Sequence, residues 1–281
     1  MQPMPVISIH AHGSYNAALS PREVALLSGW ERARRRWVTL ADVQLATNRQ
    51  VGAKVASALV RKGVLVRLKP GLYLVRPFRQ LHHPTATSAP LALEVLLHDE
   101  PHSLGGLWAF TQNGLTSQQY RSRLDAFVAR PHRPRGLAGA RVVFHRLPVA
   151  ALQVGVVETV IEGLPVRMSD GERTLVDLLE WPRIAGGLVG AIELFGRALS
   201  KVQMGRVASL GAQVAGTSTC QRMGLLLERA GASSAALRPL TARARGTKSL
   251  ISMRPGPRTG RVNVRWSVVE NDHVLGTPSA S

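Results

Sequence analysis

The chain of 281 residues lacks features that define several common protein classes. Its one cysteine, Cys220, excludes an internal disulfide framework and a zinc cluster built from cysteines. We expect Cys220 to be a small buried hydrophobic residue, as in a reducing compartment. No apolar run reaches about 18 residues, so no membrane span is expected. The N-terminus lacks the layout of a signal peptide, and a cytoplasmic location is expected.

Known catalytic and cofactor motifs are missing as well. We find no phosphate-cradling glycine loop, no zinc-peptidase histidine pair and no nucleophile elbow. The closest group of possible metal ligands is interrupted by Pro101, which favours a loop over the alternative of a metal site. Those possible ligands are His98, Asp99, Glu100 and His102. We expect no cofactor and no metal.

Three carboxylates near residue 170 raise the alternative of acid–base or metal chemistry. Ser169 and Glu172 frame a third capping box, which leads into a helix over residues 173–179. Capping and the helix dipole account for Asp170 and Glu172, and Asp177 follows on the same helix. We therefore expect no enzymatic activity.

Acidic residues are scarce, because 36 Lys and Arg stand against 17 Asp and Glu, for a net charge of +19. Residues 22–79 hold 13 basic and 3 acidic side chains, residues 121–146 hold 7 and 1, and residues 238–265 hold 8 and 0. This concentration favours a polyanionic partner. A solvated basic surface and an anionic lipid surface are the alternatives.

The first helix is expected to begin after a mobile tail, residues 1–18. Ser20 can cap it, Pro21 suits its first position, and Glu23 completes a capping box. The helix is expected to run to about Arg35. The side chains expected to be buried on it are Val24, Leu27 and Trp30.

A helix–turn–helix pattern follows. Thr39 and Asp42 form a second capping box, which opens a short helix through Leu45. Thr47 or Asn48 can cap the next helix, expected over residues 49–62 and ended by Gly63. Its apolar stripe consists of Val51, Val55, Ala58 and Leu59, and its polar, cationic stripe of Gln50, Lys54, Ser57 and Arg61. The small residues Gly52, Ala53 and Ala56 keep the flank of the polar stripe slim, which suits entry into a DNA major groove.

A basic hairpin comes next. Residues 64–68 and 72–75 are strand-like, and Pro70 and Gly71 suit the central positions of a type II turn. Together with the helices, the hairpin predicts a winged helix-turn-helix over residues 19–78. The residues expected to bind DNA are Arg34, Arg35, Arg36, Thr39, Asn48, Arg49, Gln50, Lys54, Ser57, Arg61, Arg67, Lys69 and Tyr73. A winged helix used for protein contacts is the alternative.

The rest of the chain is expected to form a larger domain over residues 91–281, after a linker at 79–90. The pattern predicts a helix over 91–97, strands over 141–147, 154–160 and 164–168, and a hairpin turn at Glu162-Gly163. Residues 188–232 have a helical pattern, residues 237–267 alternate short apolar pieces with Arg, and residues 262–266 suit an edge strand. The fold class predicted for the whole chain is α+β.

The chain resembles the AbiEi-type antitoxins of type IV toxin–antitoxin systems over roughly residues 20–270. The matching segments are residues 69–73 (KPGLY), 106–109 (GLWA) with 114–116 (GLT), 165–169 (PVRMS), 172–178 (ERTLVDL) and 222–228 (RMGLLLE). The resemblance implies a winged helix that binds inverted repeats in its own promoter and represses the operon, with two copies on the DNA. It also implies a C-terminal domain that counteracts a nucleotidyltransferase-like toxin, usually without a stable complex. On charge alone, segments 121–146 and 238–265 are the candidates for partner contact.

Two other functions are compatible with the pattern. One is an ordinary operon repressor whose C-terminal domain senses a small ligand, since apolar pockets leave no sequence signature. The other is a nuclease targeted by the winged helix, which requires acidic residues near the basic segments. Those segments contain one acidic residue, Asp125, which disfavours the nuclease.

Overall fold

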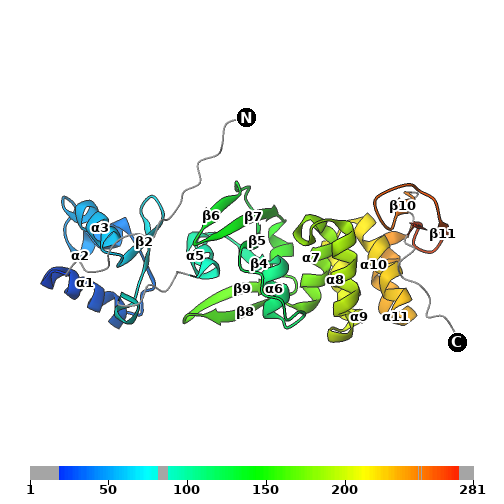
Figure 1. Cartoon of the computed structure of the whole chain (residues 1–281), viewed down its shortest axis with the longest axis horizontal. Coiled ribbons are helices and arrows are strands. Elements are labelled where there is room, and N and C mark those ends of the chain that lie inside the picture. The colour runs from blue at the N-terminus through cyan, green and yellow to red at the C-terminus, as the bar shows by residue number, and fades with distance from the viewer. Residues whose placement is uncertain (1–18, 82–87, 246, 248, 272–281) are drawn as a thin grey trace. The chain divides into compact units, whose positions relative to one another are not determined.

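The computed structural model describes residues 19–81, 88–245, 247 and 249–271, and it has a mixed α+β fold (Figure 1). The expected tail at residues 1–18 lies outside the described residues. The chain divides into two compact units, and their limits differ from the boundary expected at residues 79–90. The first unit extends to Pro101 and includes Arg133–Val142 and Thr159–Val166, and the remaining residues form the second. Tertiary contacts of two distant hairpin tips decide this division, and the sequence pattern did not predict them.

The first helix, α1 (Pro21–Arg32), begins at the predicted capping box. The Ser20 hydroxyl accepts from the Glu23 amide at 3.3 Å, and the Glu23 carboxylate accepts from the Ser20 amide at 2.7 Å. Leu27 and Trp30 are buried as expected, but Val24 is 39% exposed. The helix ends at Arg32 rather than Arg35, since Arg34 has a left-handed backbone with φ of 52°.

A short strand that the sequence pattern did not predict, β1 (Trp37–Thr39), leads directly into α2 (Leu40–Ala46). The capping box of Thr39 and Asp42 is confirmed, with the Asp42 carboxylate accepting from the Thr39 amide at 2.7 Å. Strand β1 pairs antiparallel with β3 (Leu72–Val75). Three residues are too few to show a strand period.

The helix that carries the polar stripe is α3 (Gly52–Arg61), and it starts three residues later than expected. It ends as predicted at Gly63, whose φ is 72°, with the Val64 amide donating to the Leu59 carbonyl at 3.0 Å. The hairpin of β2 (Leu65–Lys69) and β3 turns at Gly71, whose φ is 77°, and completes a sheet of order β1-β3-β2. The core residues of this region include Leu27, Trp30, Val38, Val43, Leu59, Leu65 and Val75.

Helices occupy both ends of the expected linker. These are α4 (Phe78–Leu81) and α5 (Ala89–Leu96), which begins at the side-chain cap of Ser88. Residues 82–87 lie outside the described residues. Helix α5 contacts β2 and β3, which explains why the contacts assign it to the first unit.

A mixed six-stranded sheet has the order β6-β7-β5-β4-β9-β8. Strand β4 pairs antiparallel with β5 and parallel with β9. The predicted hairpin turn is confirmed at Glu162 and Gly163, whose φ angles are 49° and 82°. The six strands are β4 (His102–Gly105), β5 (Arg123–Val128), β6 (Arg135–Leu137), β7 (Ala140–Arg146), β8 (Val156–Ile161) and β9 (Leu164–Ser169).

Several helices belong to the second unit, where α6 (Gly106–Gln112) packs against β4 and β5. The predicted helical region at residues 188–232 did not include α11, which covers Ser234–Ala244 and continues through Pro239 in its interior. The other elements are η1 (Val149–Leu152), α7 (Gly171–Glu180), η2 (Pro182–Ala185), α8 (Leu188–Ala198), η3 (Leu199–Lys201), α9 (Met204–Val214), α10 (Thr217–Arg229) and α11 (Ser234–Ala244).

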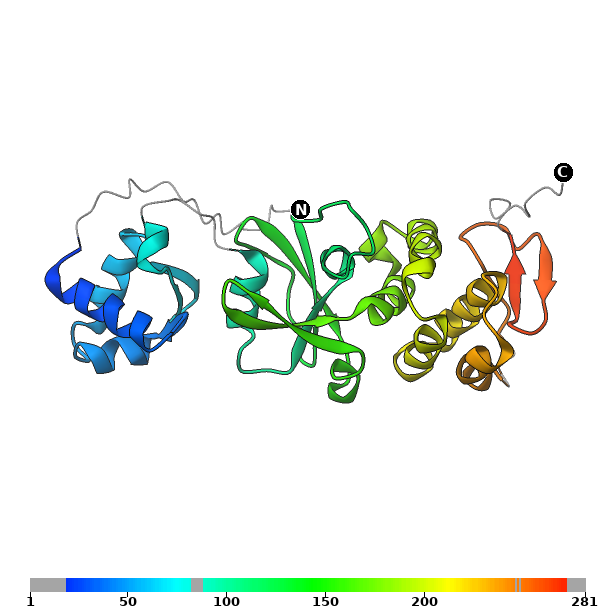
Figure 2. The same ribbon diagram turned by 90° about the horizontal axis from the view of Figure 1, so that it is seen from below.

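A small sheet lies beside α10 at the end of the described chain (Figure 2). Its strands are β10 (Ile251–Ser252), β11 (Arg261–Asn263) and β12 (Val268–Glu270), in the order β10-β12-β11. The expected strand over 262–266 stops at Asn263, and the side chain of Trp266 is fully buried. Gly224 makes room for it, since a Cβ there would lie 2.2 Å from the indole ring. In the part of the chain that is described, no helix is long and apolar enough to cross a membrane.

Candidate nucleic-acid interface

The exposed face of α3 carries three polar residues at helical spacing. Lys54, Ser57 and Arg61 are exposed as predicted. Among the described residues, no carboxylate lies within ion-pair distance of Lys54 or Arg61. Because these cations are exposed to solvent and are not neutralised by a neighbouring carboxylate, they can bind an anionic surface.

The opposite face of α3 is packed closely against α2. Gly52 and Ala56 are buried on this face, so the expectation that both flank the polar stripe is wrong. A Cβ at Gly52 would lie 2.5 Å from Cγ and 2.9 Å from Cα of Gln44. The glycine therefore permits the approach that fixes the direction of the polar stripe.

The turn before α3 presents three exposed residues, Asn48, Arg49 and Gln50. The Asn48 carboxamide accepts from the Gln50 amide at 2.7 Å, and the Thr47 hydroxyl donates to the Val43 carbonyl at 2.7 Å. Neither side chain caps α3, because each is bound within the turn, and this part of the prediction is wrong. Gln50 precedes the helix but stays on the exposed side.

The hairpin residues differ in their freedom to meet a partner. Arg67 on β2 is exposed. The ammonium group of Lys69 lies 3.4 Å from the Leu96 carbonyl and 3.9 Å from the Asp99 carboxylate. Tyr73 is only 7% exposed and packs in the core. Assigning Tyr73 to a DNA surface is therefore wrong, and Lys69 is held against α5.

The arginines after α1 also divide into different roles. Arg34 is exposed. Arg35 forms an ion pair with Asp42 at 2.6 Å, and half-buried Arg36 lies 3.5 Å from Glu162. The Thr39 hydroxyl is the cap of α2. Arg36 and Thr39 thus serve the fold, while Arg34 remains available at the surface.

Two structural contacts that the sequence pattern did not predict hold the helices behind this face. Lys62 forms an ion pair with Glu23 at 2.6 Å. A guanidinium nitrogen of Arg22 donates to the Thr47 carbonyl at 3.3 Å. Burial raises the pKa of Glu23, but the hydrogen bonds from Lys62 and Ser20 outweigh burial, and the pKa lies below its usual value. Contacts 25 and 39 residues apart leave no local signal.

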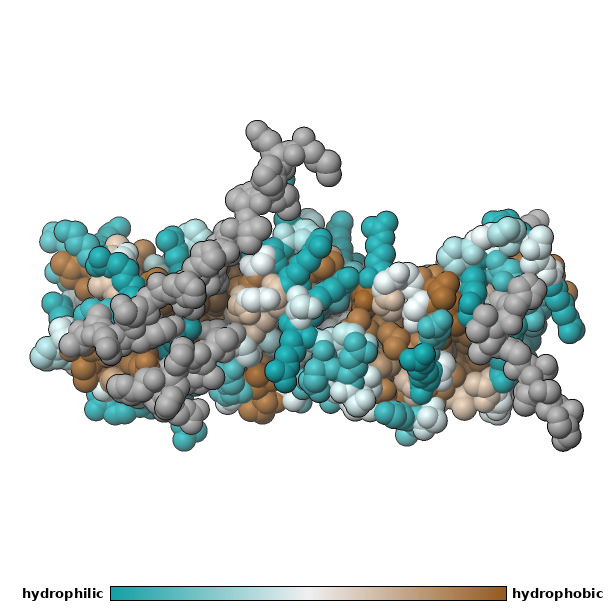
Figure 3. All heavy atoms as spheres, in the orientation of Figure 1, coloured by the Kyte–Doolittle hydropathy of each residue, from teal (hydrophilic) through white to brown (hydrophobic). Residues whose placement is uncertain are grey.

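The candidate interface consists of the predicted cations that are exposed and have no ion-pair partner among the described residues: Arg34, Arg49, Lys54, Arg61 and Arg67. The exposed polar residues Asn48, Gln50 and Ser57 belong to it as well. On the visible face of Figure 3, hydrophilic side chains gather at the edge of the region that carries α3 in Figure 1. The arrangement can hold phosphates through the cations and can contact base edges through the amides.

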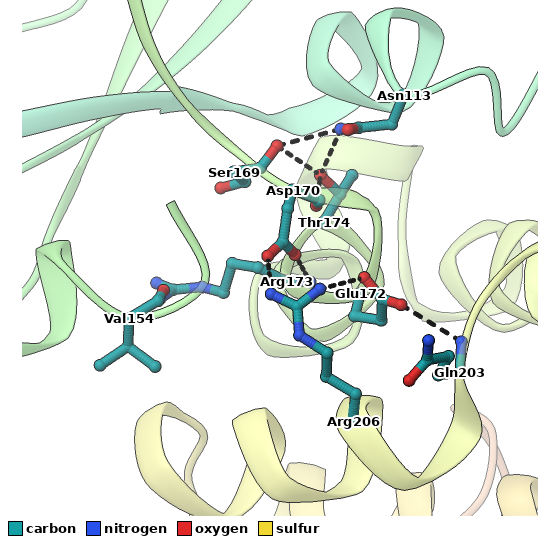
Figure 4. Close-up of polar contacts among 9 residues, drawn as sticks. All are labelled: Asn113, Val154, Ser169, Asp170, Glu172, Arg173, Thr174, Gln203 and Arg206. Atoms are coloured by element: carbon teal, nitrogen blue, oxygen red, sulfur yellow. Dashed lines mark hydrogen bonds and ion pairs between the residues drawn. The ribbon is translucent and has the colours of Figure 1, made fainter. Parts of the chain in front are cut away.

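The carboxylates near residue 170 are held in a dense polar network (Figure 4). Asp170, not Ser169, caps α7, because the Ser169 hydroxyl donates to Asp177 at 2.8 Å. Glu172 accepts from the Gln203 amide at 3.2 Å and from Arg206 at 2.8 Å. Each of these carboxylates thus has a structural partner.

Several arginines of the two C-terminal basic segments are likewise bound inside the fold. Arg123 donates to Asp125 at 2.6 Å, and Arg135 to the Leu68 carbonyl at 3.4 Å. Arg243 donates to the Ala215 carbonyl at 3.3 Å, and Arg265 pairs with Glu228. Charge along the chain therefore overstates the cations that these segments offer to a partner.

The possible metal ligands near residue 100 do not form a cluster. The Nδ1 atom of His98 lies 2.9 Å from the Val95 carbonyl oxygen. His102 begins β4 and is buried. Within the described ranges, no three His, Cys, Asp or Glu side chains are placed to hold a metal ion together.

No family model and no curated protein matches the chain. Among solved structures it is similar to the RV2827C protein from Mycobacterium tuberculosis, with a TM-score of 0.64 and 18% sequence identity. The match covers 92% of this chain and 94% of that chain. At this identity the likeness is one of fold, and it shows that the α+β arrangement recurs in a protein of known structure.

Proposed function

We propose that the N-terminal region is a winged helix-turn-helix that binds duplex DNA, with α2 and α3 as the helix-turn-helix and β2–β3 as the wing. The observation that carries the proposal is the exposed stripe of Lys54, Ser57 and Arg61 on α3. Its cations have no carboxylate partner among the described residues. The small side chain of exposed Ala53 leaves the helix slim beside the stripe.

The chemistry of the stripe suits a major groove about 12 Å wide. Arg61 and Lys54 can bind guanine edges or phosphates, and Gln50 can bind adenine through its amide. Arg67 on the wing and Arg49 in the turn suit phosphate contacts. These phosphate contacts set the register, and the base contacts discriminate among sequences.

We further propose that the chain is a repressor and antitoxin of the AbiEi type, acting in the cytoplasm on its own promoter. The support is the ordered set of segments that resembles this family, together with the basic N-terminal face. Two copies would bind an inverted repeat. The C-terminal domain would counteract a nucleotidyltransferase-like toxin.

The test of DNA binding is a titration against the chain's own upstream DNA and a scrambled duplex, at several salt concentrations. We expect preference for the upstream DNA and a steep loss of affinity with salt. Lys54→Gln and Arg61→Gln should each weaken the specific complex by about 1–3 kcal/mol if they contact bases. Arg197→Gln, at an exposed position of α8, is the matched control and should bind normally. Unchanged affinity in both α3 variants would contradict the proposal.

The antitoxin role needs its own test, because a DNA-binding protein without that role would pass the titration. We would co-express the Lys54→Gln/Arg61→Gln double variant with a nucleotidyltransferase-like toxin encoded beside it. Growth rescue by this variant, with its repression lost, is the expected result. If the parent chain does not rescue growth, the antitoxin proposal is contradicted, and the ordinary operon repressor becomes the favoured function.

A further inference from the structure

A hollow of about 360 Å³ lies between α8, α10 and the loop that follows β10. Three arginines line it: Arg222 from α10, and Arg254 and Arg258 from the loop. Leu188, Ile251 and Pro255 supply an apolar wall. The loop joins β10 and β11, both labelled in Figure 1, and this corner is mostly hydrophilic on the visible face of Figure 3.

The loop that forms the hollow is held by a dense set of hydrogen bonds. The Asn271 carboxamide accepts from the Arg254 amide at 2.9 Å and donates to the carbonyls of Arg254 and Pro257 at 3.1 and 3.0 Å. The Met253 amide donates to the Val269 carbonyl at 3.0 Å. These bonds hold in place the backbone that carries Arg254 and Arg258, so the shape of the hollow is defined by the fold.

The charges around the hollow are unbalanced. Over the part of the chain that is described, no carboxylate lies within ion-pair distance of the three arginines. The acidic groups of the neighbouring elements are taken by other arginines, since Glu270 pairs with Arg229 at 2.8 Å and Glu228 with Arg265. Three cations therefore converge without an internal counter-charge.

Two of the arginines are also partly removed from water, and no anionic group among the described residues compensates their charge. The Nε of Arg254 is buried and has no hydrogen-bond partner among the described groups. Burial lowers the pKa of Arg222, whose Nε donates only to a neutral acceptor, the Ser252 carbonyl, at 3.1 Å. A buried cation is stabilised chiefly by an anion. An anionic ligand that enters the hollow would supply this stabilisation.

We propose that the hollow binds the phosphate group of a nucleoside phosphate, either a free nucleotide or the 5′-phosphorylated end of a nucleic acid strand. Guanidinium groups suit phosphate because their planar donors can bind two oxygens at once. The apolar wall gives the sugar or base a surface to cover, and the volume falls in the usual range for small-ligand sites. This inference does not depend on DNA binding by α3.

The test uses the full chain and the fluorescent nucleotide mant-ADP, followed by fluorescence anisotropy. We expect saturable binding that unlabelled ADP and, more weakly, inorganic phosphate reverse, while adenosine does not. Arg258→Glu should weaken binding at least tenfold, since it replaces an exposed cation of the hollow with a like charge to the ligand. Arg261→Glu, on exposed β11 outside the lining, carries the same charge change and should bind normally.

The two sources of phosphate are separated by competition with a short oligothymidylate carrying or lacking a 5′-phosphate. Stronger competition by the phosphorylated form, lost in Arg258→Glu, assigns the site to strand ends, and no competition by either form assigns it to free nucleotides. Equal competition by both forms would show binding of internal phosphodiesters and would overturn the proposal. Non-saturable binding, or equal weakening by Arg258→Glu and Arg261→Glu, would overturn the proposal. Because Arg258 is exposed, its variant is expected to keep the parent's thermal unfolding midpoint, which confirms that folding is intact.

Discussion

The arginines of the N-terminal face and those of the C-terminal core are put to opposite uses. Arg49 and Arg61 are exposed, and no acidic partner lies near them among the described residues. Arg173 on α7 is 1% exposed and donates to Asp177 at 2.7 Å and to the carbonyls of Ala151 and Val154 at 2.9 and 2.6 Å. Charge counted along the chain therefore overstates the number of cations at a binding surface.

The difference lies in what surrounds each guanidinium group. A buried cation must have its donors satisfied, and Arg173 meets that need by tying α7 to the loop before β8. An exposed cation costs little to keep unpaired, so it remains available for an external anion. We expect substitutions in the first group to change stability and those in the second to change binding.

The largest effect is expected for Arg173→Met. Removing the buried guanidinium leaves the Asp177 carboxylate uncompensated, and the free energy of unfolding should fall by about 3–5 kcal/mol. Burial already raises the pKa of Asp177, so this carboxyl can take up a proton in the variant, which reduces the loss of folding free energy. Urea denaturation followed by circular dichroism measures it. A loss below about 1 kcal/mol would break the comparison, as would weaker DNA binding by the folded variant.

A second variant tests whether the N-terminal face depends on close packing. Gly52→Ala places a methyl group 2.9 Å from Cα of Gln44, so α2 and α3 must move apart, with an expected cost of about 1–3 kcal/mol. The matched control is Gly29→Ala in α1, where the new Cβ meets nothing within 4 Å. That control should be neutral or stabilising by up to about 1 kcal/mol. Equal thermal unfolding midpoints for the two variants would contradict the prediction.

Acid should weaken the N-terminal unit through its two capping carboxylates. For Asp42, as for Glu23, burial raises the pKa but the hydrogen bonds outweigh it, so both values lie below normal. A depressed pKa stabilises the fold at neutral pH, and this contribution is lost as pH falls through the folded-state pKa. Glu23→Gln with Asp42→Asn should cost about 1 kcal/mol per cap at pH 7 and flatten the acid limb of a pH–melting curve. An unchanged acid limb would disprove the assignment.

The smallest effect is expected for Arg206→Gln. Arg206 bridges Asp170 and Glu172, but its side chain is 46% exposed, so water screens the pairs. We expect a loss below about 1 kcal/mol in the urea experiment used for Arg173. A loss as large as that of Arg173→Met would show that exposure does not separate the two kinds of arginine.

Local features of the fold were predictable because their causes lie within a few residues. The capping boxes at Ser20 and Thr39 and the left-handed glycines at 63 and 71 were placed correctly. The start of α3 was misplaced, since the Asn48 carboxamide binds within its own turn rather than capping the helix. The sequence did not predict helix α11, because Pro239 interrupts the local helical pattern. Packing against α9 and α10 stabilises the helix in the folded chain.

The candidate interface was predictable only in part. The exposed stripe of α3 follows from helical periodicity, and Lys54, Ser57 and Arg61 were found that way. The exclusion of Tyr73 and the bonds of Lys69 depend on groups that arrive from the core and from α5. The arginine hollow was not foreseen as a site, because α10 and the loop after β10 meet only in the folded chain.

The sequence by itself determined the charge, the caps, the turns and the α+β class of this protein. Each of these depends on composition or on residues within about one helical turn, so no distant contact is needed to specify it. The tertiary structure alone decided which cations are exposed, which carboxylates hold the helices together and where three arginines converge. Those outcomes require segments far apart along the chain to come within hydrogen-bond distance, and burial then sets the energy of each charge.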